Sequence, residues 1–166
     1  ITSIEGAAFQ RCKNLKSIDI PSSVTSIGVS AFEDCLSLQS ITIPQGVKSI
    51  ADRTFYACGK MTSITIPEGV TSIGGEAFWV CYSLQSIDIP ESVTTIDGGA
   101  FRHCSGITSI TIPEKVSSIG REAFANCGSL SLIECKPTTP PSLGVNAFSE
   151  VNANCMIYVP DSAYDA

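Results

Sequence analysis

The chain repeats one pattern of apolar and polar positions every 23 residues. Phenylalanine stands at positions 9, 32, 55, 78, 101 and 124, and cysteine follows at 12, 35, 58, 81, 104 and 127. Two apolar blocks separate each cysteine from the next phenylalanine; the first two blocks are Leu15-x-x-Ile18-x-Ile20-Pro21 and Val24-x-x-Ile27. A fixed period of about 20 to 50 residues is typical of repeat proteins whose units stack on one another.

Each part of the repeat predicts a short element. The alternation Ile18-x-Ile20-Pro21 predicts a strand that ends at the proline, which has no N–H to give to a sheet. The spacing in Ala31-Phe32-x-x-Cys35 predicts one helical or 3₁₀ turn, and Gly28, Gly74 and Gly120 predict turns. A single unit cannot bury its apolar side chains, so we expect six strands to stack about 4.8 Å apart as a parallel sheet. The Val-x-x-Ile segments and the turns then form the opposite face.

The repeat continues beyond its sixth unit in a degenerate form. With one residue inserted near Pro137, Leu143 falls on an isoleucine position, Phe148 on the phenylalanine position and Val151 on the cysteine position. We therefore predict six repeats over residues 1–136. Residues 137–166 are predicted to be a degenerate seventh repeat that acts as a C-terminal cap.

The two ends of the chain give a further expectation. Ile1 already lies on a mid-unit position, no signal peptide is visible, and the ending over residues 161–166 looks cut short. We expect the natural protein to continue before Ile1, where a signal or anchor could lie.

Composition excludes several classes of protein. Apolar residues make up 43% of 166, which is enough to build a core. Sixteen acidic against ten basic residues give a net charge of −6, whereas a nucleic-acid-binding protein needs a basic face. No apolar run approaches the roughly 18 residues that span a bilayer, so no membrane insertion is expected from this segment. There is no C-x-x-C pair and only one histidine, so neither a metal site nor another cofactor is predicted.

The six periodic cysteines are predicted to be buried thiols that act as small hydrophobic groups, because Val151 fills their position in the last unit. Stacking makes their Cβ vectors run parallel, which disfavours disulfides between neighbours. Cys135 falls on a core isoleucine position and Cys155 on an outward one, so no bridge is expected between them. Cys155 is the candidate for the one exposed thiol.

The motif Leu-x-x-Ile-x-Ile resembles the strand signature of leucine-rich repeats. The 23-residue unit with Ile-Pro-x-x-Val and Ala-Phe-x-x-Cys resembles the BspA-like bacterial surface leucine-rich repeats, over residues 1–160. The resemblance implies a right-handed leucine-rich repeat solenoid with a parallel β-sheet on its concave face. Turns, short strands and single helical turns would form the convex face. It also implies a cell-surface or secreted protein, some members being implicated in adhesion to host proteins, and it offers no catalytic residues.

The residues themselves predict no active site. His103 is the only imidazole and is expected to be a solvated turn residue. Asp19 and Asp88 share a strand position but lie three units apart, so no carboxylate pair converges for acid–base chemistry. The pairs Gly74-Gly75 and Gly98-Gly99 are interpreted as turn glycines because they do not fit a phosphate-binding loop. We expect a protein that is not an enzyme.

Two outward surfaces are candidate binding sites. The position after the repeat phenylalanine holds Tyr56, Trp79 and Arg102 in consecutive units, with Tyr82 and His103 close by. Tyrosine, tryptophan and arginine are enriched at binding hot spots, and Trp79 and Arg102 could form a cation–π pair. The alternative is that the rings only pack over neighbouring turns. The second surface is the concave sheet, either a docking face or simply solvated, whose outward column holds Asp19, Thr42, Thr65, Asp88, Thr111 and Glu134.

Two classes of function remain open. The first is a surface-displayed module that binds a host or matrix protein, or a glycan stacked on the exposed aromatic rings. The second is a structural spacer that displays another domain and binds nothing itself.

Overall fold

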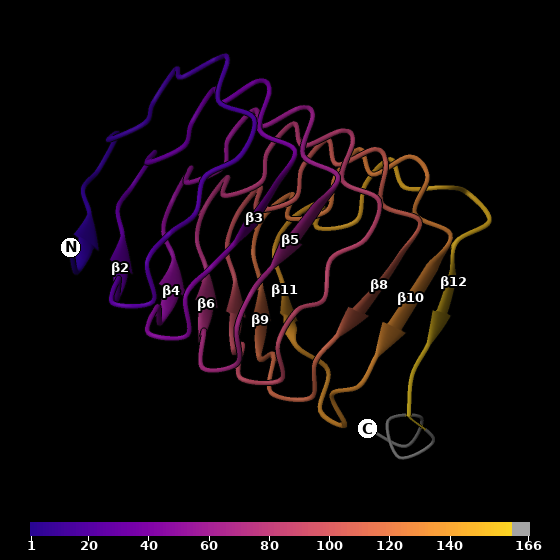
Figure 1. Ribbon diagram of the computed structural model, residues 1–166. Helices are drawn as coiled ribbons and strands as arrows, with labels where there is room; N and C mark the ends of the chain where they lie inside the picture. The colour runs from indigo at the N-terminus through magenta and orange to yellow at the C-terminus, as the bar shows by residue number, and fades with distance from the viewer. Residues whose placement is uncertain (161–166) are drawn as a thin grey trace.

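The computed structural model describes residues 1–160, which wind through about seven stacked coils (Figure 1). In this part of the chain the regular elements are short parallel strands on two sides of the stack. The first side, here called the strand face, carries β3 (Ser40–Thr42), β5 (Ser63–Thr65), β8 (Ser109–Ile112), β10 (Leu132–Cys135) and β12 (Met156–Tyr158). The second side carries β1 (Ser3–Ile4), β2 (Ser26–Ile27), β4 (Ser49–Ile50), β6 (Ser72–Ile73), β7 (Thr95–Ile96), β9 (Ser118–Ile119) and β11 (Ser142–Leu143).

Strand register follows the period of the sequence. Ile41 pairs with Ile64 on the strand face, and Ile50 pairs with Ile73 on the second side, both 23 residues apart. At the last coil the offset becomes 24 residues, since Leu132 pairs with Met156. Equivalent side chains therefore lie directly above one another, so each inward apolar position of the repeat forms its own column. This arrangement confirms the solenoid and its parallel pairing.

The strand face is not one continuous sheet. β3 pairs with β5, and β8, β10 and β12 form a second sheet, while residues 15–20 and 84–89 are not strands. Across residues 1–160, no backbone hydrogen bond joins residues 85–89 to the coil on either side. Of the six expected strands, β3, β5, β8 and β10 form, whereas the two segments with Asp19 and Asp88 at the central outward position do not. The last coil adds β12, which has Tyr158 at that position.

The third side of the stack, here called the turn face, contains the Ala-Phe-x-x-Cys segments. The predicted helical turns are wrong, because no residue from 1 to 160 is helical. Alternate amides bond within the turn and to the next coil: Glu33 N–H donates to the Ser30 carbonyl at 3.1 Å, and Phe32 N–H to Thr54 at 2.9 Å. Two residues per turn, such as Ser30 (φ 57°) and Asp34 (φ 59°), adopt the left-handed region. A right-handed helix cannot contain that alternation.

A ladder of phenylalanine rings forms the centre of the core. Consecutive rings from Phe9 to Phe148 stack with centroids 5.1 to 5.6 Å apart and interplanar angles of at most 15°. The five rings from Phe32 to Phe124 are fully buried. Offset-stacked aromatic rings at this separation add attraction beyond the area they bury.

The repeat cysteines line a second column beside the ring ladder. From Cys35 to Cys127 they are buried, and each thiol donates to a phenylalanine carbonyl of the preceding coil, as Cys58 Sγ does to Phe32 at 3.2 Å. Burial is the main cause that raises the pKa of Cys35 to about 11, and it raises that of Cys127 to about 12. These thiols act as small, weakly polar core groups.

The prediction for the exposed thiol is wrong. Cys155 and Cys135 are both half-buried and free, so Cys135 is also less buried than its core position predicted. Cys12, one of the six periodic cysteines predicted to be buried, is the exposed thiol. Its turn has no preceding coil against it in this chain, whereas the turns of the later cysteines do.

Candidate binding surface

The turn face brings together four of the five predicted aromatic and arginine residues. The rings of Tyr56 and Trp79 lie 6.0 Å apart, and those of Trp79 and His103 lie 6.2 Å apart. The guanidinium carbon of Arg102 lies 4.6 Å from the Trp79 ring centroid, and that of Arg53 lies 4.4 Å from Tyr56. We call Arg53, Tyr56, Trp79, Arg102 and His103 the aromatic–arginine cluster.

The backbone of the turn face positions the cluster. Each member at the position after a repeat phenylalanine points outward because the phenylalanine before it points into the core. The backbone N–H of Trp79 donates to the backbone carbonyl of Glu76 in its own turn at 3.2 Å. The N–H of Ala57, in the preceding coil, donates to the Trp79 carbonyl at 2.8 Å. Successive coils are thereby held in fixed register, so Tyr56, Trp79 and Arg102 form one row across three turns.

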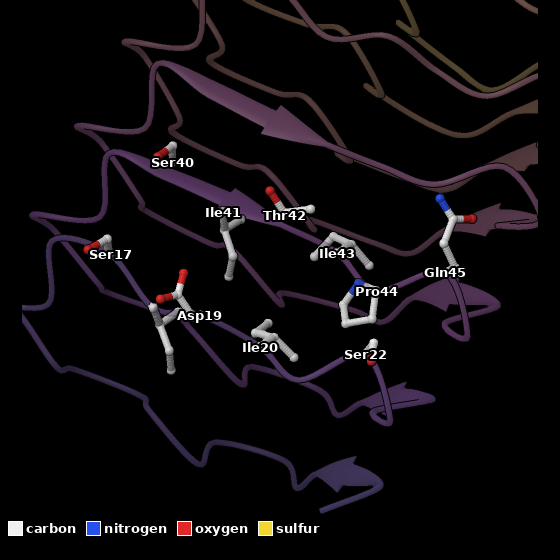
Figure 2. A pocket seen from close by; sticks show the side chains of 11 residues that line it. Ser17, Asp19, Ile20, Ser22, Ser40, Ile41, Thr42, Ile43, Pro44 and Gln45 are labelled. Atoms are coloured by element: carbon white, nitrogen blue, oxygen red, sulfur yellow. The ribbon is translucent and has the colours of Figure 1, made fainter.

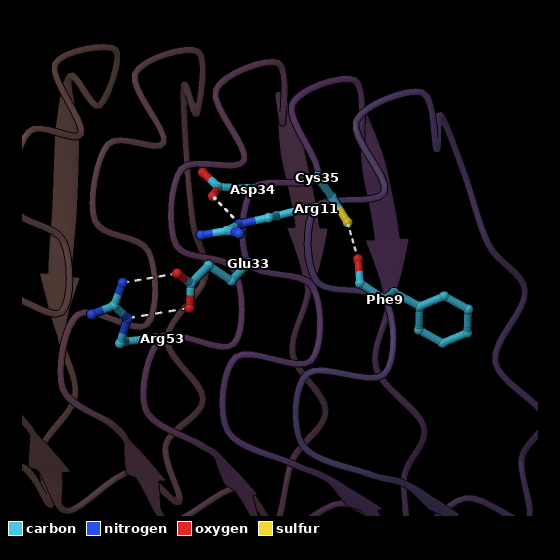
Figure 3. A network of polar contacts seen from close by, with 6 residues as sticks. All are labelled: Phe9, Arg11, Glu33, Asp34, Cys35 and Arg53. Carbon is cyan, nitrogen blue, oxygen red and sulfur yellow. Dashed lines mark hydrogen bonds and ion pairs between the residues drawn. The ribbon is translucent and has the colours of Figure 1, made fainter.

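Ion pairs hold the arginines of the cluster in place. Arg53 binds Glu33 through Nη2 at 2.8 Å and Nε at 3.3 Å, a two-pronged contact shown in Figure 3. Only 7% of Glu33 is exposed. Burial raises the pKa of Glu33, but hydrogen bonds from Ser30 and Arg53 outweigh it and hold the pKa below its ordinary value.

Arg102 forms the corresponding pair with Glu122, which also accepts from Arg121 at 3.2 Å. The Nε of Arg102 is buried and has no hydrogen-bond partner within the described part of the chain. The cluster therefore combines a guanidinium over each large ring with one donor that no protein group uses.

Tyr82 lies apart from this row. Its side chain is 54% exposed, and its ring rests on Gly59 of the preceding coil, where an added Cβ would come within 2.7 Å of the ring. Among the aromatic contacts of residues 1–160, none joins Tyr82 to Trp79 or His103. Tyr82 thus packs over a neighbouring turn, which was the alternative to a binding role for all of these rings.

The outward column of the strand face is polar and exposed. Asp19, Thr42, Thr65, Asp88 and Glu134 are exposed, and the half-buried Thr111 donates to Glu134 at 3.1 Å. A shallow hollow of about 370 Å³ separates the first two coils (Figure 2), with Asp19 and Thr42 on its two sides. These groups share no network, since only one hydrogen bond within residues 1–160 joins two members of the column.

Neither surface contains a metal-binding arrangement. No group of three or more histidine, cysteine, aspartate or glutamate side chains converges within residues 1–160. The same residues include no helix with the length and apolar character needed to cross a membrane.

Sequence reasoning missed Arg53, Glu33, Glu76 and Glu122. The signal was present, because Arg53, Glu76 and Glu122 occupy the same repeat position two residues before the phenylalanine. No contact between that position and the row formed by Tyr56 and Trp79 was predicted, although residues three apart would share a face in a helical turn as well. In the actual turn Arg53 lies over the ring of Tyr56, 4.4 Å from its centroid.

Comparison with known proteins agrees with this architecture. The sequence matches the family described as BspA type leucine rich repeat region, with six copies over residues 1–108 and 94–164. Comparison with curated proteins finds no match.

Several solved structures are similar to this chain. A leucine-rich repeat protein of T. pallidum, TpLRR, is 30% identical, with a TM-score of 0.85 over 99% of this chain and 74% of its own. A leucine rich cell surface protein of Faecalibacterium prausnitzii is 36% identical, with a TM-score of 0.62 over 81% of this chain and 43% of its own. A leucine-rich repeat protein of Eubacterium ventriosum is 27% identical, with a TM-score of 0.69 over 75% of this chain and 34% of its own.

These matches confirm the resemblance that the repeat motif predicted. The family match spans nearly the whole chain, and the similar structures share its stacked coils. The chain belongs to the BspA-type leucine-rich repeat family.

Proposed function

We propose that this chain is a non-catalytic binding module of a cell-surface or secreted protein, and that it contacts a host or matrix protein through the aromatic–arginine cluster. The observation that carries the proposal is the row of Tyr56, Trp79 and Arg102 on three successive coils. These residue types contribute most of the energy at many protein interfaces. A surface location is supported by the similar cell surface protein of F. prausnitzii.

The geometry supports a protein partner over a glycan. A sugar ring binds by stacking on a free aromatic face, but Arg102 lies over Trp79 and Arg53 lies over Tyr56. The benzo ring of Trp79 also lies against Gly99, where an added Cβ would be 3.1 Å away. Arginine held over an aromatic ring is preorganised for contact, which lowers the entropy cost of binding a protein.

Binding to a panel of extracellular-matrix proteins tests the proposal. We expect at least one of them to bind, and Trp79→Ala and Arg102→Gln to weaken that binding by ~10-fold or more, as truncation of hot-spot residues does. Tyr158→Ala is the matched control, because Tyr158 is an exposed aromatic residue at the far end of the strand face. Circular dichroism and thermal melts confirm that each variant is folded.

Three results would count against the proposal. Binding that survives both cluster substitutions would place the interface elsewhere, with the strand face as the next candidate. Recognition on a glycan array, without any matrix protein, would favour the glycan alternative. No binding to any matrix protein or to any glycan on the array would favour the structural spacer.

A further inference from the structure

A column of outward side chains on the turn face is interrupted by two glycines. Three residues before each phenylalanine, the successive coils from the second onward carry Val29, Asp52, Gly75, Gly98, Arg121 and Val145. Two adjacent coils therefore lack a side chain where the coils on both sides have one. The gap lies next to the aromatic–arginine cluster.

Packing does not require glycine at position 75, whereas at position 98 an added Cβ would fit more tightly, against a backbone carbonyl of the next coil. A Cβ added at Gly75 would meet its nearest atom at 3.6 Å, and one at Gly98 at 3.3 Å, and neither residue has a positive φ. At Gly74 and Gly120, by contrast, an added Cβ would come within 2.6 and 2.4 Å of the preceding coil. The interpretation of all these residues as turn glycines is thus incomplete, because Gly75 leaves space without relieving a clash.

The missing side chains leave two adjoining hollows of about 260 and 370 Å³ that share Glu76 and Gly98. Asp52 and Gly75 line the first, and Trp79 lines the second. We call their union the glycine hollow. Trp79 borders one end of it together with Arg102, Arg121 and Glu122, and Asp52, Glu76 and Arg53 lie at the other end.

The carboxylates at that end have no hydrogen-bonded cation. Asp52 accepts the Gly75 N–H at 2.8 Å and forms no ion pair within residues 1–160. In the same part of the chain Glu76 approaches only Arg53, at 3.7 Å, while Arg53 is already bound to Glu33 at 2.8 Å. Partial burial and the neighbouring Asp52 charge raise the pKa of Asp97, which precedes Gly98. Two carboxylates against the single guanidinium of Arg53 leave this end of the hollow with a net negative charge.

We propose that the glycine hollow receives a lysine or arginine side chain of the protein partner, whose cation binds the carboxylates of Asp52 and Glu76. This inference rests on the proposed function, since it supplies one anchor of that interface. The aliphatic stem of the incoming side chain packs beside Trp79, as long basic side chains do along apolar surface. Charge complementarity of this kind selects partners and speeds their association.

Trp79 is the only tryptophan of the chain, so its fluorescence reports directly on the hollow. The probes are a hexalysine peptide, a matched hexaglutamine peptide and a neutral oligosaccharide. We expect a saturable fluorescence change with hexalysine alone, and weaker binding as ionic strength rises. Asp52→Asn and Glu76→Gln should each weaken hexalysine binding on the order of tenfold.

Filling the hollow provides the decisive variant. Gly75→Val should abolish hexalysine binding without unfolding the protein, because Val29 and Val145 already occupy the same repeat position in other coils. Gly128→Val is the matched control, since a Cβ there would meet nothing within 4 Å. Wild-type affinity in Gly75→Val, no response to hexalysine, or an equal response to hexaglutamine or the oligosaccharide would each overturn the inference.

The matrix-protein panel separates this inference from the function on which it rests. If Gly75→Val binds the matrix protein as tightly as wild type while Trp79→Ala does not, the interface stands and the glycine hollow is not part of it. If both substitutions weaken binding, and Gly128→Val does not, both inferences are supported. If neither substitution affects binding, both the cluster and the hollow are overturned as the contact surface.

Discussion

Left-handed residues on the turn face carry a conformational cost that the stacked coils impose. The position two residues after each phenylalanine has positive φ in every coil, and Val80 occupies it at 63°. For a β-branched residue this region is a genuine outlier, with a cost of about 1 to 2 kcal/mol. The N–H of Val80 donates to the backbone carbonyl of Arg102 in the next coil at 2.9 Å, so the hydrogen bond between coils maintains the strained conformation.

Replacing Val80 should therefore stabilise the protein. Asparagine tolerates the left-handed region, so we expect Val80→Asn to raise the free energy of unfolding by about 1 kcal/mol. Chemical denaturation measures the change. Asn126→Val is the reciprocal control at the equivalent position two coils later, with φ of 62° and the same type of bond to the next coil, and it should destabilise by a similar amount. Equal stability of both variants and the wild type would contradict this account.

The strands of the strand face depend on the residue at their central outward position. β3, β5 and β8 carry threonine there, whereas residues 84–89 carry Asp88 and are not a strand. Aspartate is depleted in strands, and its carboxylate competes with the sheet for nearby N–H groups. One aspartate per coil thus accounts for the interruption between β5 and β8, while the flanking Ile87 and Ile89 stay buried.

Restoring threonine should close the sheet. We expect Asp88→Thr to pair residues 85–89 with β5 and β8, and to raise the free energy of unfolding by about 0.5 to 1 kcal/mol. Amide hydrogen exchange of those residues, followed by mass spectrometry, should slow markedly. Thr65→Asp provides the reverse change and should speed exchange in β3 and β5. Unchanged exchange in both variants would show that another feature breaks the sheet.

At the scale of the whole molecule, stability comes from contacts between neighbouring coils. Most residue pairs in contact lie at least 12 residues apart in the sequence, because each coil is too short to form a core alone. The buried phenylalanine ladder runs through every coil, so the rings in the middle have a partner on both sides. The last ring, Phe148, has one ring partner within residues 1–160 and is only half-buried.

Truncating the ladder should therefore cost most in its middle. Phe78→Ala should lower the free energy of unfolding by about 3 to 5 kcal/mol, the range for a buried phenylalanine. Phe148→Ala removes the same atoms from a half-buried position and should cost less than half as much. Equilibrium denaturation of both variants measures the difference. Equal losses at the two positions would mean that coupling between coils does not set the stability.

The sequence alone determined the periodic features of this protein. The apolar positions of each unit indicate which side chains point inward, and the constant 23-residue period stacks equivalent residues on one another. The parallel register, the phenylalanine ladder, the buried cysteines and the outward row of Tyr56, Trp79 and Arg102 follow from that repetition. Local pattern and tertiary packing agree at these positions, so sequence reasoning succeeds there.

Only the tertiary structure decided the features that depend on contacts between coils. Hydrogen bonds to the next coil, not local propensity, set the left-handed turns, which is why a helical turn was expected wrongly. The pairing of Arg53 with Glu33 joins two different repeat positions, and the register of those turns brings them together. The glycine hollow exists because Gly75 and Gly98 lack side chains beside coils that have them, so its shape is a property of neighbouring coils and of no single repeat.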